Sequence, residues 1–203
     1  IVVPKGSKVI KKKAFFENKE LTSAVIPDSV TEIGEFAFAY CTNLEEVVLP
    51  PTLVKIGKQA FERCTKLSKI VLPNSLVEIE EGAFAYCSNL TEIVIPDSIK
   101  VIRNGCFYYS GLTSIVWPQS LETIEGGAFY SCKFTSLAIP ETVTKMGKEA
   151  FMNCKNLEDI TLPKLAIIPP FLLADCSALK QVVIPNSITS IGQQAFRNCT
   201  SLT

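Results

Sequence analysis

Eight cysteines are the residues of this chain with the most obvious chemical potential. Thiols can form disulfides, bind metals or act as nucleophiles. Seven of the eight recur at one position of a repeated pattern: Cys41, Cys64, Cys87, Cys132, Cys154, Cys176 and Cys199. At an inward position, a free thiol behaves as a small buried hydrophobic group. Neighbouring repeats lie ~5 Å apart, within reach of a disulfide, but their side chains should point in parallel, so we expect all eight cysteines to be reduced.

Other groups needed for catalysis or metal binding are missing or scattered. The chain has no histidine and no CxxC pair, which removes the common nucleophile–base pairs and zinc-finger spacing. No GxGxxG or GxxxxGK[ST] phosphate-binding loop occurs. Carboxylates such as Glu45, Glu46, Glu80 and Glu81 occupy variable positions, which is typical of a solvated surface. We therefore expect no enzyme activity, no catalytic residues, no metal site and no cofactor.

Composition argues against two further classes of protein. The 20 basic residues balance the 20 acidic residues, whereas a dedicated nucleic-acid-binding protein needs a basic surface. No run of about 18 apolar residues is present, so we expect no membrane insertion. The first residues show neither an initiator methionine nor a signal-peptide pattern, so we expect the chain to be a piece of a longer protein.

Regularly spaced prolines reveal the elements that must position these side chains. They recur at almost equal intervals, at Pro4, Pro27, Pro50, Pro73, Pro96, Pro118, Pro140, Pro163 and Pro185. A period of roughly 23 residues is typical of a solenoid, in which stacked repeats close a common core. Each proline ends a predicted strand, such as residues 44–50, with Val47 and Leu49 inside and Val48 outside. The spacing of Ile33, Ala37 and Cys41 predicts a short α-helix or 3₁₀-helix.

Aromatic residues follow the same period. Eight of the twelve phenylalanines share one position, which predicts a stack of buried rings: Phe15, Phe38, Phe61, Phe84, Phe107, Phe129, Phe151 and Phe196. Trp117 precedes a proline at an inward strand position, where we expect it to fill the core. All five tyrosines lie between the phenylalanine and cysteine positions, and we expect them to be half-buried on the flank opposite the strands. A role of these tyrosines in contacting a sugar or a protein is the alternative.

The repeated pattern LxxIxLPxxLxxIgxxAFxxCxxL resembles the BspA-type, or Treponema-type, leucine-rich repeat over nearly the whole chain. The resemblance implies an α/β repeat solenoid, a horseshoe with a concave parallel sheet and short helical, 3₁₀ or extended segments on the convex side. Residues 1–203 would form a single solenoid of about nine repeats, cut from a longer array. The resemblance also implies an extracellular or cell-surface protein of bacteria or some protozoa, often linked to adhesion.

Charge alternates in sign between successive repeats in the first half of the chain. The balance is +4 over residues 1–27, −5 over 28–50, +4 over 51–73 and −4 over 74–96. Opposite charges on adjacent turns attract, whereas a shifted register would bring like charges together. We therefore expect these charges to fix the register of the repeats, with a striped docking surface as the alternative.

Outward strand positions carry the candidate binding site. Their middle row is mostly valine and is flanked by polar residues, as at a protein-binding surface, although valine favours strands on any face. The candidate residues are Val25, Val48, Val71, Val94, Val116, Glu46, Lys69, Glu92, Asp159 and Gln181. We predict a protein-interaction or adhesion module whose partner is a host or extracellular-matrix protein, with carbohydrate as the second choice and no nucleic acid. A structural spacer that projects other domains and an intracellular scaffold are the alternatives.

Overall fold

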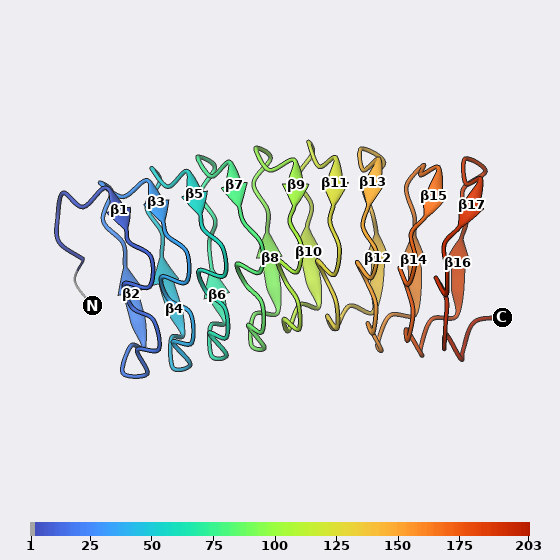
Figure 1. The fold of residues 1–203 in the computed structure, drawn as a ribbon, viewed down its shortest axis with the longest axis horizontal. Coiled ribbons are helices and arrows are strands. Elements are labelled where there is room, and N and C mark those ends of the chain that lie inside the picture. The colour runs from blue at the N-terminus through green and yellow to red at the C-terminus, as the bar shows by residue number, and fades with distance from the viewer. Residues whose placement is uncertain (1–2) are drawn as a thin grey trace.

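Parallel coils stack side by side along one axis in the computed structural model, which describes residues 3–203 (Figure 1). Seventeen short strands are described in this range, and each pairs in parallel with its counterparts in neighbouring coils. A typical coil contributes two strands, one to each of two rows. The predicted solenoid is therefore confirmed, whereas its horseshoe curvature stays a prediction, and residues 1 and 2 lie outside the described part of the chain.

Even-numbered strands form the first row, which carries the predicted binding face. In β2, β4 and β8 the middle residue is buried and the residues on either side are exposed, as the alternation in the sequence predicted. Three groups pair in turn, β2–β4–β6, β8–β10 and β12–β14–β16. The strands are β2 (Ser23–Val25), β4 (Glu46–Val48), β6 (Lys69–Ile70), β8 (Glu92–Val94), β10 (Ser114–Val116), β12 (Ser136–Ala138), β14 (Asp159–Thr161) and β16 (Gln181–Val183).

Odd-numbered strands form a second row that the sequence did not predict. Each has two residues, and a segment this short shows too few side chains to reveal a strand period. In most of them the second residue is buried, as with Ile33 in β3 and Ile56 in β5. The row comprises β1 (Val9–Ile10), β3 (Glu32–Ile33), β5 (Lys55–Ile56), β7 (Glu78–Ile79), β9 (Val101–Ile102), β11 (Thr123–Ile124), β13 (Lys145–Met146), β15 (Ile167–Ile168) and β17 (Ser190–Ile191).

The helical or 3₁₀ segment predicted between Ile33 and Cys41 is wrong, because residues 3–203 contain no helix. Linked turns take its place. Their backbone amides donate alternately to carbonyls of the same coil and to carbonyls of the next coil. The amide of Ala37 donates to Gly34 O within the coil at 3.1 Å, whereas the amide of Phe38 donates to Ala60 O of the next coil at 2.8 Å. A helix would keep these hydrogen bonds inside the segment and cannot include the positive φ of 56° at Phe36.

Stacked phenylalanines fill the centre of the coils from Phe15 to Phe151, as predicted, whereas Phe196 is only partly buried and stacks on no described ring. The rings of Phe38, Phe61 and Phe84 are fully buried and nearly parallel, with centroids 5.3 and 5.4 Å apart. Trp117 packs against the core and meets Phe129 edge-on at 5.5 Å. In the last described coil Ile184 and Ile191 are exposed, whereas their counterparts in the second coil, Ile26 and Ile33, are buried. None of the described residues forms a helix that could cross a membrane.

Cysteines line the core beside the phenylalanine stack, and none of the eight is in a disulfide. Each thiol in the column donates a weak hydrogen bond to a carbonyl of the preceding coil, as Cys87 Sγ does to Phe61 O at 3.2 Å. Burial raises the pKa of the Cys41 thiol to about 11 and that of Cys132 to about 12. These two thiols therefore stay protonated in neutral solution, which suppresses their reactivity.

Titration with a thiol reagent should find slow reaction in the native protein and eight thiols after denaturation without reductant. Seven cysteines are buried, and only Cys199, in the last coil, is partly accessible. Cys199 should therefore react first, and a Cys199→Ala variant provides the control by removing that early phase. Fewer than seven thiols in the denatured, unreduced protein would show that disulfides link the coils.

Candidate functional site

A row of exposed valines runs along the face of the even-numbered strands, which we call the even-strand face. Valine side chains project from consecutive coils because each occupies the outward position next to a buried strand residue. Their exposed fractions lie between 48% and 70%, at Val25, Val48, Val71, Val94 and Val116. The structure thus places the five predicted valines outward, and their role in binding stays a prediction.

Three open hollows lie along this row of valines. The first, of about 610 Å³, lies over Val25 and is bordered by Lys5, Pro27 and Asp28. The second, of about 320 Å³, contains Val48 and Val71. The third, of about 440 Å³, contains Val71, Val94 and Val116. Because Val71 lines both the second and the third, these two hollows adjoin, although β6 and β8 belong to different groups of paired strands.

Three charged side chains stand beside the valines on consecutive coils. Glu46 and Lys69 line the second hollow, and Lys69 and Glu92 line the third. All three are exposed, and Glu46 and Lys69 are register partners in β4 and β6. Within the described part of the chain, no ion pair involves any of the three. Their charges are therefore available to a bound molecule.

Asp159 and Gln181 are not brought together with the other predicted site residues. They lie on β14 and β16, in the separate group of strands after β10, and line none of the three hollows. The middle outward residues there are Ala138 and Thr161, which interrupt the valines. Asp159 is half-buried and accepts a hydrogen bond from Ser136 Oγ at 2.8 Å. The apolar part of the face therefore extends from β2 to β10.

Prolines and polar turn residues, which are not among the predicted site residues, form the second wall of the hollows. These residues follow the strands and include Pro27, Asp28, Pro51, Pro73 and Asn74. The regular prolines were recognised as ends of strands, but their position shortly after each outward valine also placed them beside the site. That spacing was the signal that could have identified this wall.

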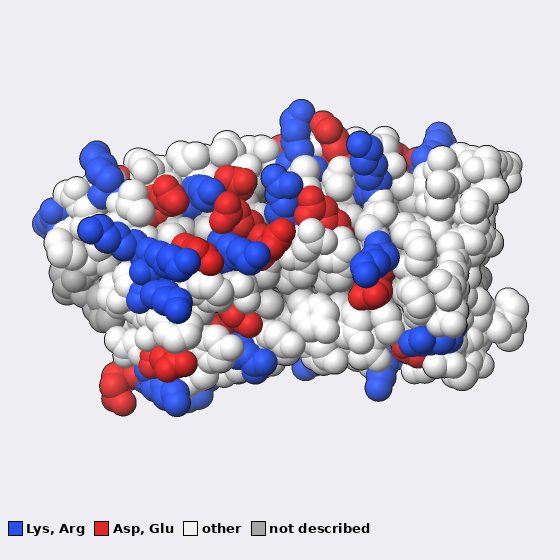
Figure 2. Space-filling model, in the orientation of Figure 1, with Lys and Arg blue, Asp and Glu red and all other residues white. Residues whose placement is uncertain are grey.

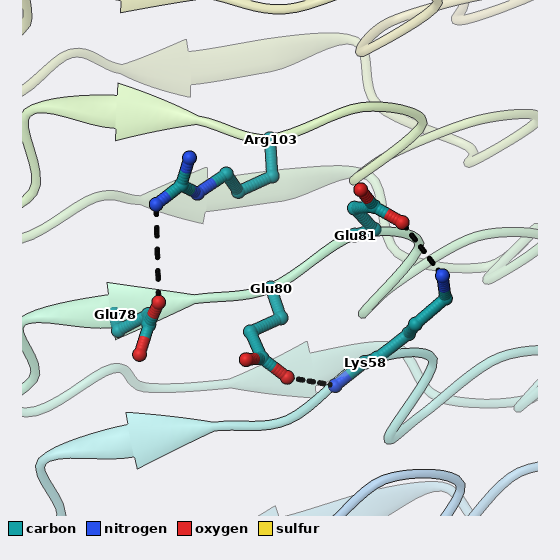
Figure 3. A pocket seen from close by; sticks show the side chains of 5 residues that line it. All are labelled: Lys58, Glu78, Glu80, Glu81 and Arg103. Carbon is teal, nitrogen blue, oxygen red and sulfur yellow. Dashed lines mark hydrogen bonds and ion pairs between the residues drawn. The ribbon is translucent and has the colours of Figure 1, made fainter.

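Paired charges occupy the row of odd-numbered strands, which we call the odd-strand face. Basic and acidic side chains are interleaved there, mainly towards the N-terminal part of the molecule (Figure 2). Around a hollow of about 300 Å³, Lys58 Nζ lies 2.7 Å from Glu81 and Arg103 lies 3.8 Å from Glu78 (Figure 3). Burial raises the pKa of Glu80, but hydrogen bonds from Lys55 Nζ and the Lys58 backbone amide outweigh it and leave that pKa below its ordinary value.

Most of these ion pairs join one coil to the next, as the alternating charge of neighbouring repeats predicted, and their effect on the register stays a prediction. Examples are Lys12 with Glu35 at 2.6 Å, Lys55 with Glu78 at 3.3 Å and Arg103 with Glu125 at 3.2 Å. Most carboxylates of this face are thereby paired within the chain, and no group of residues in the described range 3–203 could hold a metal ion. The charged side chains of the odd-strand face therefore have a structural role, because they stabilise contacts between coils.

Tyrosines stack along the flank formed by the linked turns. The Arg63 guanidinium lies 4.2 Å from the Tyr86 ring centroid, and Tyr86 stacks on Tyr109 at 5.4 Å. Tyr108 stacks on Tyr130 at 4.7 Å, and burial raises the pKa of both hydroxyls. The prediction of half-buried tyrosines is confirmed for most of them, whereas Tyr109 is 41% exposed. The faces of the tyrosine rings cover one another, so these side chains already have stacking partners within the chain.

Comparisons with known proteins agree with this architecture. The profile of the BspA type leucine rich repeat region matches residues 8–133 and 100–203, with six copies. A leucine rich cell surface protein of Faecalibacterium prausnitzii is 31% identical, with a TM-score of 0.78 over 100% of this chain and 66% of that protein. A leucine rich repeat protein of T. pallidum is 29% identical, with a TM-score of 0.63 over 91% of this chain and 79% of that protein. A search of curated proteins gave no significant match.

Proposed function

Because this chain belongs to the BspA-type leucine-rich repeat family, we propose that it is a protein-interaction module that binds its partner on the even-strand face. The observation that carries the proposal is the unbroken row of exposed valines from Val25 to Val116, with hollows between the valines and the prolines. The likeness to the cell surface protein of F. prausnitzii, of which this chain spans 66%, supports the cell-surface location that we propose. Adhesion to a host or matrix protein is the use we propose for this face.

Energetic considerations support an apolar contact at these valines. Burying one exposed valine side chain contributes about 1–1.5 kcal/mol, so five of them supply on the order of 5–7 kcal/mol. Association costs several kcal/mol in lost freedom, so valines alone would give weak binding and polar contacts must add to it. Because the inward residues of the same strands are fixed in the core, the valines are held in place before a partner binds.

The double variant Val71→Lys and Val94→Lys should lose at least ten-fold in binding to an immobilised extract of extracellular-matrix proteins. Two ammonium groups in the third hollow would have to lose water against an apolar partner, which is unfavourable. Both side chains point outward, so the fold should be retained. Binding is measured as a concentration series on the coated surface, with circular dichroism to check folding.

Val77→Lys is the matched control, because Val77 is 57% exposed but does not line the hollows of the even-strand face. It should bind like the unchanged protein. Equal loss in the control and the double variant would mean that added charge acts non-specifically. Unchanged binding of the double variant would contradict the proposed face, and complete lack of binding by the unchanged protein would favour the structural spacer.

A further inference from the structure

We infer that the partner of the even-strand face is an amphipathic α-helix that lies along the axis of the coils, with basic, acidic and basic side chains facing Glu46, Lys69 and Glu92 in that order. The inference rests on the proposed function of the same face. It goes further by assigning the shape of the partner and the order of its charges. Three observations carry it: the spacing of the valines, the hollows between them, and the unpaired charges beside them.

Spacing favours a helix over an extended segment. Paired parallel strands lie about 4.8 Å apart, so within the groups β2–β4–β6 and β8–β10 one valine is presented about every 4.8 Å along the axis. An α-helix advances about 5.4 Å per turn, so apolar side chains that recur once per turn meet nearly one valine each. An extended segment presents side chains on one face only about every 6.6 Å and loses register with the valines after two coils. The row from Val25 to Val116 therefore accommodates a helix of several turns.

Hollows provide the room for the apolar side chains of such a helix. The second and third hollows adjoin at Val71 and together extend from Val48 to Val116. Prolines and turn residues border them on one side, and Glu46, Lys69 and Glu92 border them on the other. A helix whose apolar side chains pack on the valines therefore places one flank beside these three charged residues.

Charge pairing distinguishes the two faces of the solenoid and sets the order of charges on the partner. On the odd-strand face, acids and bases of neighbouring coils form ion pairs, as Lys55 does with Glu78. On the even-strand face, Glu46, Lys69 and Glu92 alternate in sign but form no described ion pair. A helix presents residues i, i+4 and i+7 on one flank, one per turn, so the complementary order is Lys, Glu, Lys.

Two synthetic helical peptides of equal composition test this order of charges. Both carry the same leucine face, one with Lys–Glu–Lys and the other with Glu–Lys–Glu on the flank, and compensating residues lie on the solvent side. Measured by fluorescence anisotropy at low salt, the first should bind about ten-fold more tightly, and the difference should shrink at high salt. A version of the first peptide with two internal prolines should bind at least ten-fold more weakly, because it cannot form the helix.

A charge-swapped protein provides the reciprocal test. The variant Glu46→Lys, Lys69→Glu and Glu92→Lys should reverse the preference between the two peptides. Exchanging the ion pair Lys100 and Glu122 on the odd-strand face, as Lys100→Glu with Glu122→Lys, should leave the preference unchanged. Failure of the swap to reverse the preference, equal binding of both peptides, or equal binding of the proline peptide would overturn the inference.

Failure of this inference can be told apart from failure of the proposed function. If neither peptide binds while the unchanged protein still binds the matrix extract through Val71 and Val94, the helical partner is wrong and the binding face stands. If Val71→Lys with Val94→Lys leaves both matrix and peptide binding intact, the face itself is wrong. Each result therefore decides one of the two proposals.

Discussion

Replacing Phe84 by alanine should lower the free energy of unfolding by about 3–5 kcal/mol. The Phe84 ring is fully buried and lies between Phe61 and Phe107, with centroids 5.4 and 5.6 Å away. Backbone hydrogen bonds between coils fix their spacing, as from the Phe84 amide to Cys106 O at 2.9 Å. The neighbouring rings therefore cannot move together to close the cavity, so the effect should fall in the upper part of the range for large-to-small changes.

Denaturant unfolding measures this loss, and Thr91→Ala is its control. Thr91 lies in the same coil, just before β8, and its side chain is exposed. An exposed substitution of this kind should change the free energy of unfolding by less than about 0.5 kcal/mol. Equal denaturation midpoints for the two variants would contradict the assignment of the phenylalanine column to the core.

Alkaline solution should unfold the protein through its buried thiols. Burial raises the pKa of seven cysteines above the ordinary value: Cys41, Cys64, Cys87, Cys106, Cys132, Cys154 and Cys199. In the unfolded chain these thiols ionise near pH 8.5, whereas in the folded protein they stay protonated to about pH 11 or beyond. Above about pH 8.5 the unfolded state binds fewer protons than the folded state, so stability falls as pH rises.

The expected size of this effect is large because the thiols act together. Each one removes up to about 1.4 kcal/mol per pH unit, so by pH 10 their sum is on the order of 10 kcal/mol. Total stabilities of domains are about 5–15 kcal/mol, so the protein should unfold between about pH 9 and pH 10.5. Denaturant midpoints at pH 7, 9 and 10, in the presence of reductant, follow the loss.

Cys87→Ala tests whether buried thiols cause the alkaline loss. The variant removes a fully buried thiol and its hydrogen bond to Phe61 O, so it should be less stable at pH 7. Between pH 9 and pH 10, however, its stability should fall by about 1 kcal/mol less than that of the unchanged protein. A steeper or unchanged pH dependence would contradict the thiol mechanism.

Rigid packing connects these two stability predictions to binding. The inward residues of β4, β6 and β8 belong to the same core as the phenylalanines and cysteines. Their outward neighbours, which include Val48, Glu46 and Lys69, are therefore held at a fixed spacing from coil to coil. A surface that is ordered before it binds loses less conformational freedom on binding, which favours a partner with a matching regular spacing.

Which side chains point inward and which point outward was determined by the sequence alone. Prolines at almost equal intervals defined the repeat, and the apolar positions between them defined the phenylalanine and cysteine columns. The outward valines from Val25 to Val116 followed from simple alternation around the buried strand residues. These features are readable because burial of a side chain depends on its position within one repeat, and every repeat presents that position again.

Only the tertiary structure decided where the backbone hydrogen bonds go and which outward residues share a surface. Ile33, Ala37 and Cys41 are spaced like one face of a helix, but the amide of Phe38 bonds to the next coil, which no local pattern in the chain records. Likewise, Glu92 and Asp159 occupy equivalent positions in the sequence pattern, yet Glu92 lines the third hollow whereas Asp159 lines none of the three. The physical reason is that both outcomes depend on contacts between residues of different coils, whereas sequence periodicity reports only on neighbours within a coil.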